Sequence, residues 1–339
     1  MNAPYRFTLE IYDGQGASLG QEPISVDFQP AEEWARFMAI RSGVLPAARP
    51  SAQAFLQPIW HHDRGRPYTE GFRVRLQMEH HREATSDFTA LYFGELAQQA
   101  SSRLVERMQL RPGDPFQFIV TAFPKEEREE RPRPRFRAEE VVTALPVREA
   151  VLRDRMRSAS PQGVVQADDI PVFVPRGVLI EATALALEKG AIETGGILVG
   201  HLYRDQIAGE IFAGVTTQIP AVHALGDRTS LKFTAEAWTH VQGVLDLRRR
   251  DEVHLGWWHS HIPNAWCRNC PIERRRRCPL STGFFSTQDR SLHRAVFSPA
   301  YAQALVVNVI GADEQTTTMF GWRHGTIQQR GFYVVEETA

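Results

Sequence analysis

Hydrophobic and polar positions alternate with a period of two in several short segments of the first third of the chain. Residues 5–12 (YRFTLEIY) and 72–78 (FRVRLQM) show this pattern, and 115–123 (PFQFIVTAF) is a further apolar run. Such segments are typical of β-strands. Residues 90–110 instead space their apolar side chains as one face of a helix. The pattern therefore predicts an N-terminal α+β domain over residues 1–123.

A charged, proline-rich segment follows this domain. Residues 124–138 (PKEEREERPRPRFRA) contain too little apolar surface to offset the entropy of ordering, so a linker is predicted. A helix leading out of the linker is one option for 139–156, and 158–166 is expected to be a second flexible stretch. The linker region as a whole is assigned to 124–169.

From residue 170 to the end at 339, strand-like and helix-like segments alternate. This alternation predicts one mixed β-sheet flanked by helices, so the fold class expected for the chain is α/β, of the α+β kind. Strands are expected at 171–174, 195–202, 209–217, 253–261, 303–310, 317–322 and 332–335, and helices at 176–189, at 234–248 and from Ser286 onward.

Composition and charge exclude several classes of protein. The 339 residues suffice for two domains, and 42% apolar with 23% charged residues is ordinary for a soluble globular protein. The net charge of −1 gives no global field that favours nucleic acid or an anionic membrane. No segment approaches the ~20 apolar residues of a membrane span, and the N-terminal pattern predicts no secretory signal, so a cytoplasmic location is expected.

Candidate metal ligands lie at the end of an expected strand. His259 and His261 are two residues apart, so both imidazoles are expected on the same face, where they can converge on one ion. A catalytic zinc takes three protein ligands and leaves a position for water. Asp289 offers the third ligand, and it shares a helix face with Ser286, although Ser-x-x-Asp is by default a helix N-cap. A carboxylate outside this set, Glu193, is the candidate general acid/base.

Three segments together resemble the signature of the JAMM (MPN+) zinc metallopeptidases, including their prokaryotic JAB-like members. They are ETGGILVGH at 193–201, GWWHSH at 256–261 and STQD at 286–289, and the likeness covers about residues 170–339. The resemblance implies a JAMM/cytidine-deaminase-like fold, a mixed sheet with helices. It also implies a hydrolase that cleaves isopeptide or peptide bonds after the C-terminal tail of a ubiquitin-like or sulfur-carrier protein, with other components of a conjugation system as partners.

Carried over to this chain, the resemblance makes His259, His261 and Asp289 the zinc ligands. Glu193 becomes the acid/base, and Ser286 becomes a stabiliser of the oxyanion. Two departures concern the loop after the histidines. The proline that often follows H-x-H directly is displaced to Pro263, and the gap to Ser286 is longer than in the family, with an insertion at 262–285.

The insertion carries all three cysteines of the chain. Cys267 and Cys270 have the C-x2-C spacing of a zinc half-site, and Cys278 follows a basic run. A second, structural zinc would need a histidine as fourth ligand, with His293 and His254 as candidates. The resemblance allows this, because some endosome-associated JAMM deubiquitinases carry a second zinc in an insertion. An iron–sulfur cluster and three unliganded thiols on a loop are the alternatives.

Four consecutive arginines, Arg274, Arg275, Arg276 and Arg277, form the basic run of the insertion. They either form a solvated surface or contact an acidic partner or phosphate beside the site.

Two pairs of adjacent histidines, His61-His62 and His80-His81, lie in the N-terminal domain, with Asp63, Glu79 and Glu83 nearby. Adjacent side chains on a strand face opposite ways, so neither pair is expected to bind metal.

Two other functions remain open at this stage. One is a non-catalytic MPN-type scaffold, although the chain retains every residue of the motif. The other is a repair-associated JAMM relative that binds nucleic acid through the insertion. The net charge of −1 argues against a large phosphate footprint and so against nucleic acid.

Overall fold

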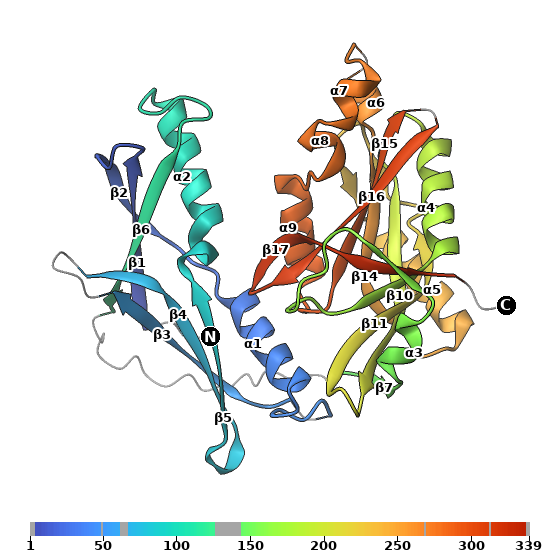
Figure 1. Ribbon diagram of the computed structural model, residues 1–339, viewed down its shortest axis with the longest axis horizontal. Helices are drawn as coiled ribbons and strands as arrows, with labels where there is room; N and C mark the ends of the chain where they lie inside the picture. The colour runs from blue at the N-terminus through green and yellow to red at the C-terminus, as the bar shows by residue number, and fades with distance from the viewer. Residues whose placement is uncertain are drawn as a thin grey trace. The chain divides into compact units, whose positions relative to one another are not determined.

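The computed structural model describes residues 4–48, 50–61, 67–125, 144–267, 269–311 and 313–336 (Figure 1). The chain divides into two compact units. The first comprises Met1–Ile40 with Val44–Ala144, and the second comprises Arg41–Gly43 with Leu145–Ala339. Both units contain helices and β-sheet, which confirms the expected α+β class. Residues 126–143, which include most of the predicted charged linker, lie outside the described residues.

The first unit is built on one antiparallel sheet. Its strands are β1 (Tyr5–Asp13), β2 (Ser18–Ile24), β3 (Gln53–His61), β4 (Tyr68–Gln77), β5 (Glu83–Thr89) and β6 (Phe116–Pro124), and its helices are α1 (Gln29–Arg41), η1 (Glu79–His81), η2 (Ala90–Phe93) and α2 (Gly94–Glu106).

The strand order in this sheet is β2-β1-β6-β4-β3, with β5 paired to β4. Leu9, Phe72 and Val120 from three strands are fully buried in the core. Phe93 contributes a buried ring beside Phe72, at 5.8 Å between centroids. The strands expected at 5–12, 72–78 and 115–123 therefore correspond to β1, part of β4 and β6.

Three features of the first unit differ from the expectation. The helix α1 was not predicted, although it buries Trp34 and Phe37, because five of its other positions are alanine or arginine and give a weak apolar signal. The helix expected over 90–110 starts as a 3-10 turn and ends at Glu106, since Met108 takes a left-handed conformation (φ 58°) that stops it. Strands β2, β3 and β5 also lacked a strong pattern.

The second unit contains the candidate site. Its strands and helices are β7 (Val147–Glu149), α3 (Leu152–Met156), β8 (Ala159–Gln162), β9 (Val172–Pro175), α4 (Arg176–Lys189), β10 (Gly195–Asp205), β11 (Glu210–Pro220), β12 (Leu225–Gly226), β13 (Leu231–Lys232), α5 (Ala235–Arg248), β14 (Val253–His261), α6 (Pro263–Trp266), α7 (Ile272–Arg276), α8 (Pro279–Thr282), α9 (Thr287–Val296), β15 (Gln303–Gly311), β16 (Glu314–Arg323), β17 (Thr326–Arg330) and β18 (Phe332–Val335).

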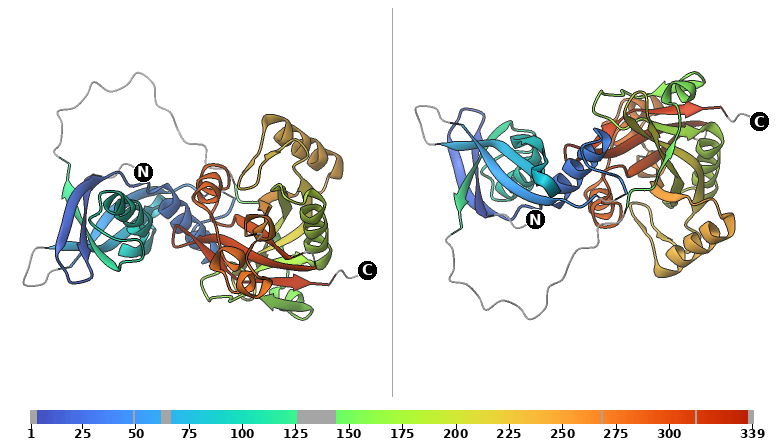
Figure 2. Two further views of the ribbon diagram at one scale, coloured as in Figure 1. Left: turned by 90° about the horizontal axis from the view of Figure 1, so that it is seen from above. Right: turned by 90° about the horizontal axis from the view of Figure 1, so that it is seen from below.

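Most of these strands form one mixed sheet with the order β17-β16-β15-β14-β10-β11-β9-β18-β8, and β7 pairs with β10. β14 lies between β15, to which it is parallel, and β10, to which it is antiparallel. The sheet is strongly twisted, and helices lie on both of its faces (Figures 1 and 2). The strand that carries the two histidines is therefore a central one, held by hydrogen bonds on both edges.

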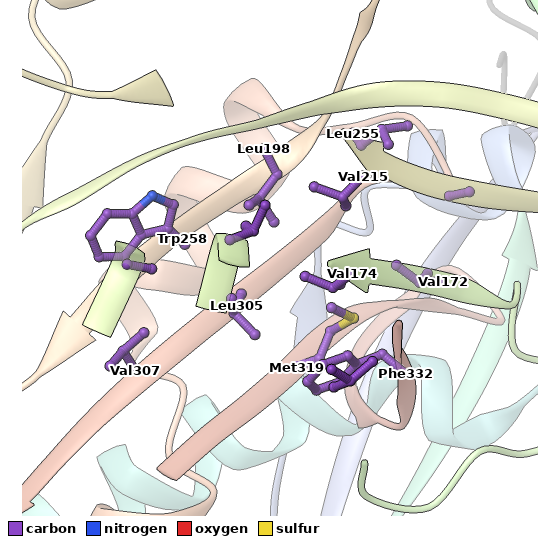
Figure 3. Packing of buried hydrophobic residues seen from close by; sticks show 14 of the residues in the cluster. Val172, Val174, Leu198, Val215, Leu255, Trp258, Leu305, Val307, Met319 and Phe332 are labelled. Carbon is purple, nitrogen blue, oxygen red and sulfur yellow. The ribbon is translucent and has the colours of Figure 1, made fainter. Parts of the chain in front are cut away.

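The two faces of β14 serve different purposes. Trp258 points into the main hydrophobic core with Leu198 and Leu305 of the neighbouring strands (Figure 3), and α4 covers this face through Val178 and Ala182. Because side chains alternate along a strand, Trp257, His259 and His261 point to the opposite face, which α9 covers. The site thus lies on the face of the sheet that α4 does not cover.

Two segments before the sheet differ from the sequence-based expectation. The optional helix over 139–156 is wrong at 147–149, which forms β7 parallel to β10, and only Leu152–Met156 is helical. The stretch 158–166, expected to be flexible, contains β8, which pairs with β18 at the far end of the chain. Both strands are short and polar, so their structure comes from the strands they pair with and not from their own pattern. In the described part of the chain, no helix is long and apolar enough to cross a membrane.

Candidate metal centre

Three potential ligands converge at the C-terminal end of β14. The Nε2 atoms of His259 and His261 lie 3.0 Å apart. Asp289 of α9 places Oδ1 3.3 Å from His259 Nε2 and Oδ2 3.5 Å from His261 Nε2. Among the described residues, these three form the only group of His, Cys, Asp or Glu side chains with three donor atoms gathered closely enough to hold a metal ion.

Local structure explains why Asp289 reaches this position. Ser286 is the N-cap of α9, and its Oγ accepts a hydrogen bond from Asp289 N (3.0 Å). Asp289 Oδ2 in turn accepts one from Ser286 N (2.8 Å). This reciprocal capping box fixes the carboxylate at the start of the helix. Asp289 can therefore cap α9 and serve as a metal ligand at the same time.

The donor set fits zinc. Two ligands on a tetrahedral zinc, each about 2.0–2.1 Å from the metal, are about 3.3 Å apart. The three separations here, 3.0, 3.3 and 3.5 Å, lie around that value. Two imidazoles and one carboxylate are also a donor set that catalytic zinc uses.

The three groups polarise one another strongly. Burial by itself raises the pKa of Asp289, but the adjacent imidazoles of His259 and His261 outweigh it and hold that pKa below its usual range. Burial lowers the pKa of His261 and the charge of His259 adds to this shift, while Asp289 opposes it without reversing it. For His259, which is completely buried, the charge of Asp289 outweighs burial and raises the pKa. The negative charge of Asp289 thus compensates positive charge at the imidazoles.

Glu193 lies two residues before the start of β10, next to this group. Gly195 is paired with His259 in the sheet, and Ser260 N donates to Thr194 O (2.8 Å), which extends the pairing toward Glu193. Gly195 has no room for a side chain, because a Cβ there would lie 2.3 Å from the carbonyl oxygen of Trp258. This close approach of β10 and β14 places Glu193 beside the two histidines.

A second tether holds Glu193 from the other side. Its backbone N–H donates to Asp227 O (2.7 Å), and a Cβ on Gly226 would lie 2.1 Å from its carbonyl oxygen. The short β12–β13 hairpin therefore packs directly against Glu193. The side chain is buried, with 4% of its surface exposed.

The environment of Glu193 tunes its proton affinity. Burial raises the pKa of Glu193 to about 7; the charge of His259 opposes this shift and that of Asp289 adds to it. A carboxyl group with a pKa near neutrality can both accept and donate a proton at physiological pH. Glu193 is therefore close enough to His259 and Asp289 for their charges to act on its carboxyl group.

Ser286, assigned by the resemblance to the oxyanion, lies at the edge of the cluster and is half-buried. Its Oγ accepts the hydrogen bond from Asp289 N, so its own hydroxyl hydrogen is available for donation.

The cysteines of the insertion do not join the cluster. Cys267, Cys270 and Cys278 are half-buried, and no group of three donor atoms in the described residues includes a cysteine. The two histidines considered as a fourth ligand are not gathered with them: His293 is buried among aromatic rings on α9, and His254 lies beside Trp238. The second metal site stays a prediction.

The arginine run divides into two pairs. Arg275 NH1 donates to Ile310 O (2.7 Å), and Arg276 binds Glu314 and Glu273 at 2.8 Å each. Arg275 and Arg276 thus connect α7 to strands β15 and β16, and Arg276 also forms an ion pair within α7. Arg274 and Arg277 are exposed. Arg276 is exposed as well but is engaged by two carboxylates, so Arg274 and Arg277 are the pair better placed to contact a partner.

The histidine pairs of the first unit are not part of a metal cluster in the described residues. His61 Nδ1 lies 2.6 Å from Glu70, and His80 and His81 take left-handed backbone conformations in a 3-10 turn. His62 and Asp63 lie outside the described residues.

Two further side chains that the sequence analysis did not single out bear on the site. Ser260, between the two histidines, accepts a hydrogen bond from Thr194 N through Oγ (3.0 Å). Trp257 stacks on His259 with centroids 4.5 Å apart and donates its indole N–H to His293 Nδ1 (3.0 Å). The alternation of β14 could have pointed to Trp257, which shares the face of His259, but its partner on α9 is fixed only by the tertiary fold.

Comparison with known proteins gives little further information. No protein-family model matches the chain, and no curated protein matches it. Among solved structures, the chain is similar to the solution structure of protein DSY2949 from Desulfitobacterium hafniense. The two share 18% identity and a TM-score of 0.33, over 49% of this chain and 94% of that chain.

Proposed function

We propose that the second unit is a zinc-dependent peptidase or isopeptidase. The observation that carries the proposal is the convergence of His259, His261 and Asp289, with donor atoms 3.0 to 3.5 Å apart, beside the buried carboxyl group of Glu193. Zinc-assisted hydrolysis requires three protein ligands and a separate acid/base whose pKa lies near neutral pH.

The residues of the chain would divide the work as follows. Zinc bound by the three ligands supplies Lewis acidity and lowers the pKa of a bound water. Glu193 takes the proton from the attacking water at its carboxylate and returns it to the leaving nitrogen, two steps that its pKa of about 7 suits. Ser286 directs its hydroxyl hydrogen to the oxygen of the scissile carbonyl as negative charge develops there.

The proposed substrate is the C-terminal tail of a ubiquitin-like or sulfur-carrier protein, cleaved after its last glycine. One support is the resemblance of the segments ETGGILVGH, GWWHSH and STQD to the JAMM signature. The other is that the fold brings His259 and His261 of the second segment close to Asp289 of the third. Other components of a conjugation system would be partners, and the proposed place of action is the cytoplasm.

Hydrolysis of a defined probe tests this function. The probe is a ubiquitin-like protein whose C-terminal Gly-Gly is joined to a fluorescent amine, incubated with the full chain and added zinc. Release of the amine should stop with a chelator and return with zinc. Glu193→Gln should lower the rate at least about 100-fold without loss of the metal.

Glu188→Gln provides a matched control, because Glu188 is an exposed carboxylate on α4 and should leave the rate unchanged. Equal rates for wild type and Glu193→Gln would contradict the assignment of the acid/base. A zinc-loaded wild type that cleaves no such probe would favour the non-catalytic scaffold.

A further inference from the structure

The three proposed ligands come from two separate elements, so their geometry depends on how β14 and α9 are held together. His259 and His261 belong to β14, and Asp289 belongs to α9. Ligand side chains must be held to within about 0.5 Å for a site to work well. A contact that fixes these two elements relative to each other therefore acts on the ligand set as a whole.

Such a contact is present one turn along α9 from Asp289. The indole N–H of Trp257 on β14 donates to Nδ1 of His293 on α9 at 3.0 Å. Both side chains are completely buried. Because an indole N–H can only donate, Nδ1 must be the unprotonated, accepting nitrogen of a neutral ring.

The same indole also restrains a ligand directly. Trp257 stacks on His259 with a centroid separation of 4.5 Å and an interplanar angle of 13°. A histidine that binds metal ordinarily gives its second ring N–H to a hydrogen-bond acceptor, which fixes the ring. Within the described part of the chain, Nδ1 of His259 and Nδ1 of His261 have no such partner. The stacked indole takes over this orienting function at His259.

A simple packing role explains His293 poorly. Its ring is enclosed by Phe285, Phe297 and Trp322, with centroids 5.4 to 6.2 Å away. Its Nε2 is buried and has no hydrogen-bond partner among the described residues. Burying an imidazole here leaves Nε2 without a hydrogen bond, which costs free energy, while Nδ1 accepts the hydrogen bond from Trp257. An apolar side chain of similar size would avoid that cost but could not accept from Trp257.

We propose that His293 is a positioning residue: through the indole of Trp257 it sets the orientation of His259 and the distance of Asp289 from it. The inference rests on the proposed zinc site. It adds a function for two residues that neither bind the metal nor contact the substrate.

The zinc dissociation constant, measured by competition with a chelator, tests this role without reference to activity. His293→Leu keeps the volume but removes the acceptor, and it should raise the dissociation constant about tenfold or more, as loss of an orienting partner does in other zinc sites. His293→Asn places Oδ1 where Nδ1 was and should restore affinity to within about threefold. Trp257→Phe keeps an aromatic ring and removes the donor, and it provides the same test should His293→Leu fail to fold.

Phe297→Leu is the matched control. Phe297 packs on both Trp257 and His293 but makes no polar contact to either through its side chain. It should lower the melting temperature and leave zinc affinity within about twofold.

An unchanged zinc affinity in His293→Leu, or an equal loss in His293→Leu and His293→Asn, would overturn the positioning role while leaving the zinc site intact. No zinc uptake by the wild type would overturn the proposed function, and this inference with it.

Discussion

Ser260 and Thr194 are joined by two hydrogen bonds. Ser260 N donates to Thr194 O at 2.8 Å, and Thr194 N donates to Ser260 Oγ at 3.0 Å. Ser260 is the residue between the two histidines, and Thr194 follows Glu193. The pair therefore ties the proposed acid/base to the strand that carries two of the proposed ligands.

Ser260→Ala should weaken both stability and hydrolysis. The substitution leaves Thr194 N without its acceptor, which costs about 1–2 kcal/mol for a poorly hydrated group. The Glu193 segment also gains freedom, so kcat should fall more than KM rises. Urea unfolding and steady-state kinetics on the same samples measure the two effects.

Ser281→Ala is the control for this change. Ser281 is also buried, but its Oγ makes no hydrogen bond within the described residues. Its removal should change the free energy of unfolding by less than about 0.5 kcal/mol. Equal effects of the two substitutions would refute a specific role of Ser260.

The raised pKa of Glu193 predicts a pH dependence of stability in the metal-free protein. Folding favours the protonated carboxyl group, so this contribution to stability is full below the ordinary pKa of 4.5 and is lost as the pH rises through about 7. Glu193→Gln cannot ionise. It should therefore be more stable than the metal-free wild type at pH 8, by at most about 3 kcal/mol, and no more stable at pH 4.

Thermal unfolding at a series of pH values, in the presence of a chelator, checks this. A difference between wild type and Glu193→Gln that does not vary between pH 4 and pH 8 would show that Glu193 is not held in a desolvated environment.

Asp169 is expected to be a critical buried charge outside the site. Its Oδ1 accepts from Arg323 Nε at 2.9 Å and lies 3.9 Å from Arg330, and all three side chains are buried. Burial lowers the pKa of Arg330 to about 10, and Asp169 opposes that shift. Asp169→Asn leaves two guanidinium groups without their common counter-charge and should destabilise the protein by about 3–5 kcal/mol.

Urea unfolding measures this loss. Arg276→Ala is the comparison, because its ion pair with Glu314 is partly exposed to solvent and its loss should change the unfolding midpoint little. A small effect of Asp169→Asn would mean that solvent reaches Arg323 and Arg330.

The arginines of the run are expected to differ in function, some affecting substrate binding and one affecting stability. Arg274 and Arg277 are exposed, whereas Arg275 is bound to Ile310 O. Arg274→Ala/Arg277→Ala should raise KM for the ubiquitin-like probe and leave the melting temperature unchanged. Arg275→Ala should lower the melting temperature. An unchanged KM in the double variant would show that Arg274 and Arg277 do not contact the substrate and are only solvated surface residues.

The sequence predicts those parts of the fold whose pattern is strong. The bounds of α4, β14 and β18 coincide with the expected ranges, because each has a clear apolar period or a glycine after its last turn. Strands β7 and β8 were missed, since two short polar segments become strands only by pairing with β10 and β18.

The site shows the same division. The alternation of β14 predicted that His259 and His261 share a face, and the resemblance of the three segments to the JAMM signature added Asp289 to them; the structure brings the three together. The contact of Trp257 with His293 depends on how α9 packs on the sheet. No local pattern carries that information, and the same holds for the tether between Ser260 and Thr194.

Zinc content per chain tests the central claim most directly. It should be measured by elemental analysis on the wild type, on His259→Ala/His261→Ala and on Cys267→Ser/Cys270→Ser, all purified without chelator. We expect the histidine variant to contain one zinc fewer than the wild type. The cysteine variant should also contain one zinc fewer if the insertion binds a second metal, and the same amount as the wild type if it does not. A wild type that contains no zinc and takes up none on addition, or a histidine variant with the same zinc content as the wild type, would contradict the account.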